Sequence, residues 1–200
     1  MNRHERRALD ALRFDWAYTP EDVWTTSSYH VDGLHDEVLH SVADGMRDAR
    51  DSQAASPVGV AILGQHGTGK THLLGIVREQ VQSGGGYFFL VDLLDAGAFW
   101  ERLAQAILDG LLRETDRHER QLLAFLRRLC RLTGVPAEVQ AAVTGEGPLS
   151  RRDLTSFAVA LRRLDRRIGL ECQDAARALV LLGSADYEVQ DIGHQYLQSM

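Results

Sequence analysis

Two short runs of the chain are almost wholly apolar and do not alternate with polar residues. They cover residues 58–63, Val-Gly-Val-Ala-Ile-Leu, and residues 87–91, Tyr-Phe-Phe-Leu-Val. Runs of this length are typical of strands that are buried on both faces of a parallel sheet. The pattern therefore predicts two buried strands separated by 23 residues, a spacing that leaves room for one crossover helix.

Most of the remaining chain shows apolar residues at the i, i+3, i+4 spacing of amphipathic helices. Residues 178–182 have an alternative interpretation as a buried strand, but the helix formers just before them, in 173–177, favour a helix. In the helix after residue 69 we expect Arg78 and Glu79 to face outward. The helices that the pattern predicts cover residues 4–13, 36–50, 69–81, 96–114, 117–133, 136–143, 150–168, 173–182 and 186–198.

A glycine-rich loop lies between the first predicted strand and the helix that follows it. Its sequence fits the pattern G-x-x-x-x-G-K-[ST], with residues Gly64, Gln65, His66, Gly67, Thr68, Gly69, Lys70 and Thr71. Glycine lets the chain turn tightly so that several backbone N–H groups converge on a phosphate. The following helix directs its positive end at the same point.

The side chains after this turn indicate the ligand. Lys70 supplies a mobile charge for the β- and γ-phosphates, and the hydroxyl of Thr71 is expected to bind Mg²⁺. Lys70 is the single lysine of a chain with 21 arginines, and the planar fork of arginine does not replace a compact ammonium here. We therefore expect ATP and Mg²⁺ to bind at residues 64–71, with His72 beside them.

Two motifs resemble those of a known family. The run Gly-Lys-Thr-His-Leu-Leu at 69–74 resembles the bacterial replication-initiator and helicase-loader branch of AAA+ ATPases. Residues 31–37, with Gly33 and Glu37, resemble the N-terminal motif of initiator-type AAA+ and STAND ATPases, although Leu34 and His35 replace the usual arginine and acidic residue. The resemblance implies an α/β fold of the P-loop NTPase type, with parallel strands, a Walker A loop and a mostly helical C-terminal region. It also implies that ATP hydrolysis drives a conformational change in an oligomer acting on DNA or protein.

Hydrolysis needs a carboxylate that organises Mg²⁺ and water. Asp92 ends the second predicted strand, but it is separated from Lys70 by too few residues for a Walker B aspartate. Asp186 follows a segment whose apolar residues have a helical period, whereas a Walker B aspartate follows a strand. We therefore expect the chain to be the N-terminal part of a larger ATPase whose hydrolysis uses elements beyond residue 200. The alternatives left open are a non-hydrolysing nucleotide-sensing or scaffolding module and, less favoured, a P-loop kinase.

We expect three regions: a leader and helix in 1–50, the nucleotide-binding core in 51–115 and a helical region in 116–200. The leader holds three aromatic residues near Pro20, which predict an arm packed on another part of the chain. These residues are Trp16, Tyr18 and Trp24.

The charge and composition of the chain limit the classes of partner that it is expected to bind. A net charge of −6 argues against bulk binding to nucleic acid, although one helix carries a local arginine row that predicts either a solvated face or a contact to DNA or protein. With 44% hydrophobic residues and no long apolar stretch, the chain is expected to be cytoplasmic, without membrane contact, and to keep its two cysteines, Cys130 and Cys172, as free buried thiols. The arginine row consists of Arg162, Arg163, Arg166 and Arg167.

Overall fold

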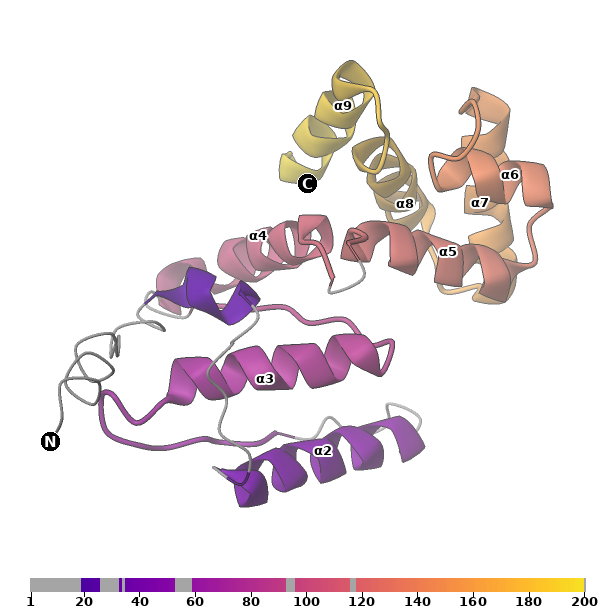
Figure 1. Ribbon diagram of the computed structural model, residues 1–200. Coiled ribbons are helices and arrows are strands. Elements are labelled where there is room, and N and C mark those ends of the chain that lie inside the picture. The colour runs from indigo at the N-terminus through magenta and orange to yellow at the C-terminus, as the bar shows by residue number, and fades with distance from the viewer. Residues whose placement is uncertain are drawn as a thin grey trace, which may run out of the picture. The chain divides into compact units, whose positions relative to one another are not determined.

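The chain folds into two compact units, Met1–Leu90 and Val91–Met200 (Figure 1). The computed structural model describes residues 19–25, 33, 35–52, 59–92, 96–115 and 118–199. The predicted helix at 4–13, the aromatic residues Trp16 and Tyr18, and residues 31, 32 and 34 of the motif at 31–37 lie outside the described residues.

The predicted parallel strands do not form. In the described part of the chain every regular element is a helix, and β structure is limited to one isolated antiparallel bridge between Glu114 and Arg120. Residues 59–63 and 87–91 have no regular structure, and Leu63 is 92% exposed. The predicted α/β fold class of the P-loop NTPase type is therefore wrong.

The two apolar runs are used for side-chain packing instead. A parallel strand needs a neighbouring backbone to bond with and helices over both faces of its sheet. In this structure Ile62 and Phe88 pack against a small cluster formed by the helix between the runs and the helix before the first run. A buried strand and a short apolar segment that packs on a helix have the same amino-acid pattern. Only the tertiary contacts distinguish the two structures.

The first unit is built around one central helix. Helix α3 (Lys70–Ser83) lies beside α2 (Asp36–Asp51), and the 3₁₀ segment η1 (Pro20–Trp24) packs on α3 as well (Figure 1). The predicted helices at 36–50 and 69–81 are thus confirmed to within a few residues. The core of this unit consists of Leu39, Leu73 and Val77.

An arginine fastens η1 to α3. Arg78, predicted to face outward, is only 1% exposed, and its Nε donates a hydrogen bond of 2.9 Å to the carbonyl of Val23. Gly75 lies one turn earlier, where an added Cβ would sit 3.5 Å from the same carbonyl oxygen. Next to this contact the ring of Trp24 meets Phe88 edge to face, with centroids 5.5 Å apart. The expectation that Trp24 packs within the chain is confirmed.

The second unit consists of helices joined by short connections. The predicted helices at 173–182 and 186–198 are confirmed, which rules out a strand at 178–182. The helix predicted for 150–168 stops at Leu164, because Asp165 is extended and its carboxylate binds Arg167. The elements are η2 (Ala96–Ala98), α4 (Phe99–Leu112), α5 (Gln121–Thr133), α6 (Ala137–Val143), α7 (Arg151–Leu164), α8 (Leu170–Leu182) and α9 (Tyr187–Gln198).

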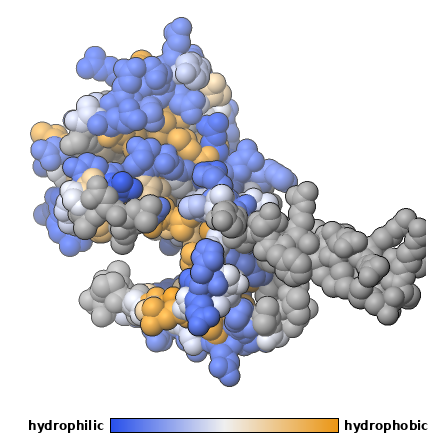
Figure 2. All heavy atoms as spheres, turned by 90° about the vertical axis from the view of Figure 1, so that its left-hand side faces the viewer, coloured by the Kyte–Doolittle hydropathy of each residue, from blue (hydrophilic) through white to orange (hydrophobic). Residues whose placement is uncertain are grey.

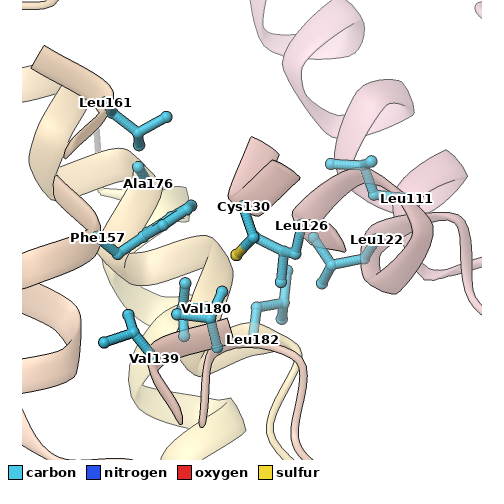
Figure 3. Close-up of a cluster of buried hydrophobic side chains, with 11 residues drawn as sticks. Leu111, Leu122, Leu126, Cys130, Val139, Phe157, Leu161, Ala176, Val180 and Leu182 are labelled. Atoms are coloured by element: carbon cyan, nitrogen blue, oxygen red, sulfur yellow. The ribbon is translucent and has the colours of Figure 1, made fainter. Parts of the chain in front are cut away.

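The core of this unit is formed mainly by α5, α6, α7 and α8, whose apolar side chains point toward one another (Figure 3). Phe157 and Leu126 are completely buried, and full burial of such a side chain contributes about 1.5–3 kcal/mol. Burial raises the pKa of the Cys130 thiol to about 11, so this thiol is neutral at physiological pH. Both cysteines are free, but Cys172 is exposed, so the prediction of burial is correct only for Cys130.

Apolar residues also reach the surface of the molecule. Figure 2 shows them in orange among a largely hydrophilic surface on one face. None of the helices in the described residues has both the length and the apolar character that crossing a membrane requires.

Helices α8 and α9 meet at a glycine. A Cβ added to Gly193 would lie 2.6 Å from the carbonyl oxygen of Ala178 and 2.6 Å from the amide nitrogen of Leu182. Real Cβ atoms do not approach backbone atoms so closely, so any side chain at this position separates the two helices.

We predict that Gly193→Ala lowers the free energy of unfolding by about 1–3 kcal/mol, the usual cost of forcing an extra methyl group into a packed contact. Urea unfolding followed by circular dichroism measures this change. Gly59→Ala is the control, because nothing lies within 4 Å of its added Cβ, and we expect it to change stability by less than about 0.5 kcal/mol. Equal stability of the two variants would contradict the close helix contact.

We also predict that Arg78→Met lowers stability by about 1–3 kcal/mol. Methionine keeps much of the apolar stem but leaves the buried Val23 carbonyl without this donor. It also removes the donor to Oε1 of Gln82, which Nη1 of Arg78 approaches to 2.9 Å. The exposed Arg163 supplies the matched control, Arg163→Met, which we expect to be nearly neutral. If the two variants unfold at the same urea concentration, Arg78 does not fasten η1.

Candidate functional site

The glycine loop predicted from the sequence turns sharply just before α3. Gly67 and Gly69 have φ angles of 81° and 84°, in the left-handed region that glycine adopts without strain. Gly69 is also the N-cap residue of α3 and, as a glycine, has no side chain that could cap this end of the helix. Alternation of left-handed and ordinary backbone turns successive N–H groups toward one side, which creates a concave surface suited to an anion.

Lys70 folds back over this turn. Its Nζ donates hydrogen bonds to the carbonyl oxygens of Gly64, at 2.9 Å, and Gln65, at 2.6 Å. The hydroxyl of Thr68 donates to the same Gln65 carbonyl at 2.8 Å. An ammonium group has three donors, so these two contacts hold the charge at the loop and leave one donor for a ligand.

Gly64 is required at the first position of the loop for a separate reason. A Cβ at this residue would lie 2.7 Å from Oγ1 of Thr68. A larger residue would therefore push the Thr68 hydroxyl away from the Gln65 carbonyl and open the turn. The first glycine of the motif thus provides space, whereas Gly67 and Gly69 provide backbone conformation.

The first turn of α3 contains the other predicted residues. Lys70, Thr71 and His72 are half-buried, while Gln65 and His66 are exposed in the loop before them. The first backbone bond of the helix runs from the Leu73 N–H to the Gly69 carbonyl, at 2.9 Å. The N–H groups of the first turn precede this bond and have no intrahelical partner. The helix start therefore presents donors and a partial positive charge beside the Lys70 ammonium.

The two aspartates considered for metal binding are placed differently. Asp92 is exposed. Asp186 is the N-cap of α9, where Oδ1 accepts a hydrogen bond of 2.9 Å from the Glu188 N–H, an ordinary structural use of aspartate. Within the described ranges no group of three or more His, Cys, Asp or Glu residues could hold a metal ion.

The predicted arginine row gathers at the C-terminal end of α7. Arg162 and Arg163 lie exposed in the last turn, where positive charge complements the helix dipole. Beyond the helix, Nη2 of Arg167 binds Oδ2 of Asp165 at 2.7 Å. This hydrogen bond lowers the pKa of Asp165 to about 2. The helix dipole therefore accounts for Arg162 and Arg163, and the ion pair with Asp165 accounts for Arg167.

The sequence did not reveal a cavity in the second unit. It has a volume of about 630 Å³ and lies where the α4–α5 connection meets the ends of α6 and α8 and the start of α9. Its lining includes Glu114, His118 and Arg120. These residues follow no motif, and no sequence signal could have brought them together, because the cavity depends on the packing of several helices.

No protein-family model, curated protein or solved structure matches this chain. The resemblance to AAA+ and STAND ATPases was based on two short motifs, and the described residues form helices where a P-loop NTPase requires a parallel sheet. The assignment to that superfamily is therefore wrong. The glycine loop itself is present as a turn at the start of a helix.

Proposed function

We propose that the chain binds ATP together with Mg²⁺ at residues 64–72. The observation that carries this proposal is the convergence of three features at one point: the left-handed glycines, the Lys70 ammonium and the uncapped start of α3. Each favours a multiply charged anion for a separate physical reason. The proposal depends on this local geometry alone and requires no sheet.

The phosphate chain would replace interactions that the loop now makes with itself. Lys70 holds the carbonyls of Gly64 and Gln65, and a phosphate oxygen is a stronger acceptor than a carbonyl because it carries charge. The ammonium can turn toward the phosphates through its flexible stem while the loop glycines keep their conformation. A triphosphate gains more from this arrangement than a single phosphate does, since it can bind the helix start and the ammonium at once.

Thr71 is the residue that we expect to bind Mg²⁺. Its hydroxyl follows Lys70 directly in the first turn of α3 and is half-buried there. A hydroxyl oxygen is a suitable ligand for Mg²⁺, which keeps several waters and bridges to the phosphate oxygens. Lys70 neutralises only part of the negative charge of the triphosphate, and Mg²⁺ would neutralise more of it.

The proposal covers binding of the nucleotide and leaves hydrolysis aside. Among the alternatives, a nucleotide-sensing or scaffolding module is favoured by one observation. Asp186, one of the two aspartates considered as the carboxylate for hydrolysis, uses its side chain to cap α9. We do not propose a DNA or protein contact at the arginine row as a second function, because the helix dipole and Asp165 account for three of its four arginines.

We predict that Lys70→Ala weakens ATP binding about tenfold or more, since a charge-assisted hydrogen bond is typically worth about 1.5–3 kcal/mol. Isothermal titration calorimetry with Mg²⁺ present measures the affinity, and circular dichroism checks that the helices persist. Arg128→Ala removes an exposed positive charge elsewhere and serves as the control. Unchanged affinity in Lys70→Ala, with the fold intact, would remove the basis of the proposal.

We further predict that Thr71→Val abolishes most of the gain in ATP affinity that Mg²⁺ provides, because valine keeps the shape of threonine but lacks the hydroxyl. The comparison is between titrations with Mg²⁺ and with EDTA. Thr155→Val, at an exposed position of α7, controls for the loss of a hydroxyl group. If both variants respond to Mg²⁺ as the unchanged chain does, Thr71 is not a metal ligand.

A further inference from the structure

The cavity in the second unit has a preformed wall. On either side of residues 116 and 117, the connection between α4 and α5 is held by the backbone bridge between Glu114 and Arg120 and by a hydrogen bond of 2.8 Å from the Thr115 N–H to the Glu119 carbonyl. At its base, Nε2 of the fully buried Gln121 donates to the Gly110 carbonyl at 2.6 Å. Residues fixed in this way lose little conformational entropy when a ligand binds. We call this site the helix-end cavity, lined by Glu114, His118, Arg120, Thr144, Gly183 and Gln190.

Among the described residues of the helix-end cavity, two charged side chains have no charged partner. Arg127, at its edge, binds the carboxylates of both Glu119 and Glu146. The side chains of Glu114 and Arg120, by contrast, make no ion pair or hydrogen bond with any residue that the structure describes. Because they are opposite one another in an antiparallel bridge, their side chains emerge on the same side of the backbone.

Helix ends add to the negative side of the cavity. Both α6 and α8 terminate here, and a Cβ added to Gly145 would lie 3.8 Å from the carbonyl oxygen of Gly183. The C-terminal end of a helix carries a partial negative charge that favours a cation. The cavity thus offers a carboxylate acceptor at Glu114, partial negative charge at the ends of α6 and α8, and a guanidinium donor at Arg120.

We propose that the helix-end cavity binds a small zwitterion carrying an α-ammonium and a carboxylate, that is, an amino acid or a short peptide. The ammonium would bind Glu114 and the helix ends, and the carboxylate would bind the guanidinium of Arg120. A ligand with one charge would leave either Glu114 or Arg120 without a partner. The volume of about 630 Å³ lies within the range of small-molecule sites. This site is independent of the nucleotide loop.

The test uses the full chain and a set of defined probes. The twenty L-amino acids and glycylglycine are each added at about 10 mM, a concentration that detects millimolar affinity, in a thermal-shift screen followed by calorimetry. We expect at least one probe to bind. Saturation by an amino acid alone or by the dipeptide alone identifies which of the two is preferred. If none binds, the proposal is overturned.

Derivatives and variants of matched charge test the recognition. For each probe that binds, the N-acetyl form lacks the ammonium and the amide form lacks the carboxylate, and we expect both to bind at least about tenfold more weakly. Arg120→Ala and Glu114→Gln, at exposed positions, are expected to cause a loss of similar size, whereas the exposed Arg128→Ala and Glu138→Gln outside the cavity cause none. Unchanged binding of the derivatives, or in Arg120→Ala, overturns the proposal.

Discussion

Burial of apolar helix faces against other helices is the constraint on which the rest of the described structure depends. Described residues outside the helices supply no sheet that could take this role. In the second unit Leu126, Phe157 and Val180 come from three different helices and meet in one core (Figure 3). In the first unit Leu39, Leu73 and Val77 form a much smaller core, and polar contacts contribute more of its organisation.

Two buried backbone carbonyls accept hydrogen bonds from long polar side chains, and these bonds join neighbouring elements. Arg78 binds the carbonyl of Val23, and Gln121 binds that of Gly110. In both cases a long polar side chain donates to a buried backbone carbonyl of another element, and at Gly110 this bond adds to the one from the Arg113 N–H at the end of α4. A buried carbonyl without a donor is costly. These two side chains therefore determine where η1 and the α4–α5 connection lie, and through them the surroundings of α3 and the wall of the helix-end cavity.

Glycine sets the close contacts in both units, for two different reasons. At Gly67 and Gly69 the backbone is left-handed, and the loop requires conformational freedom. At Gly64 and Gly193 the requirement is space, since a Cβ would collide with Thr68 in one case and with the backbone of α8 in the other. A sequence shows only that glycine is present at a position, and the reason becomes visible once its neighbours are known.

The sequence by itself determined most of the described helices and the glycine loop. Helical period and a preceding run of helix formers correctly predicted α8, and the spacing of three glycines before Lys70 predicted a turn at the start of α3. These features are local, because each depends on residues within a few turns of one another. The tertiary structure alone decided the fate of the apolar runs at 59–63 and 87–91, the burial of Arg78 and the meeting of Glu114 with Arg120 beside two helix ends. A strand exists only if another backbone bonds to it, and a charged side chain is buried only if a distant carbonyl accepts its hydrogen bond. Both conditions depend on segments far away in the sequence, so the local pattern could not show them.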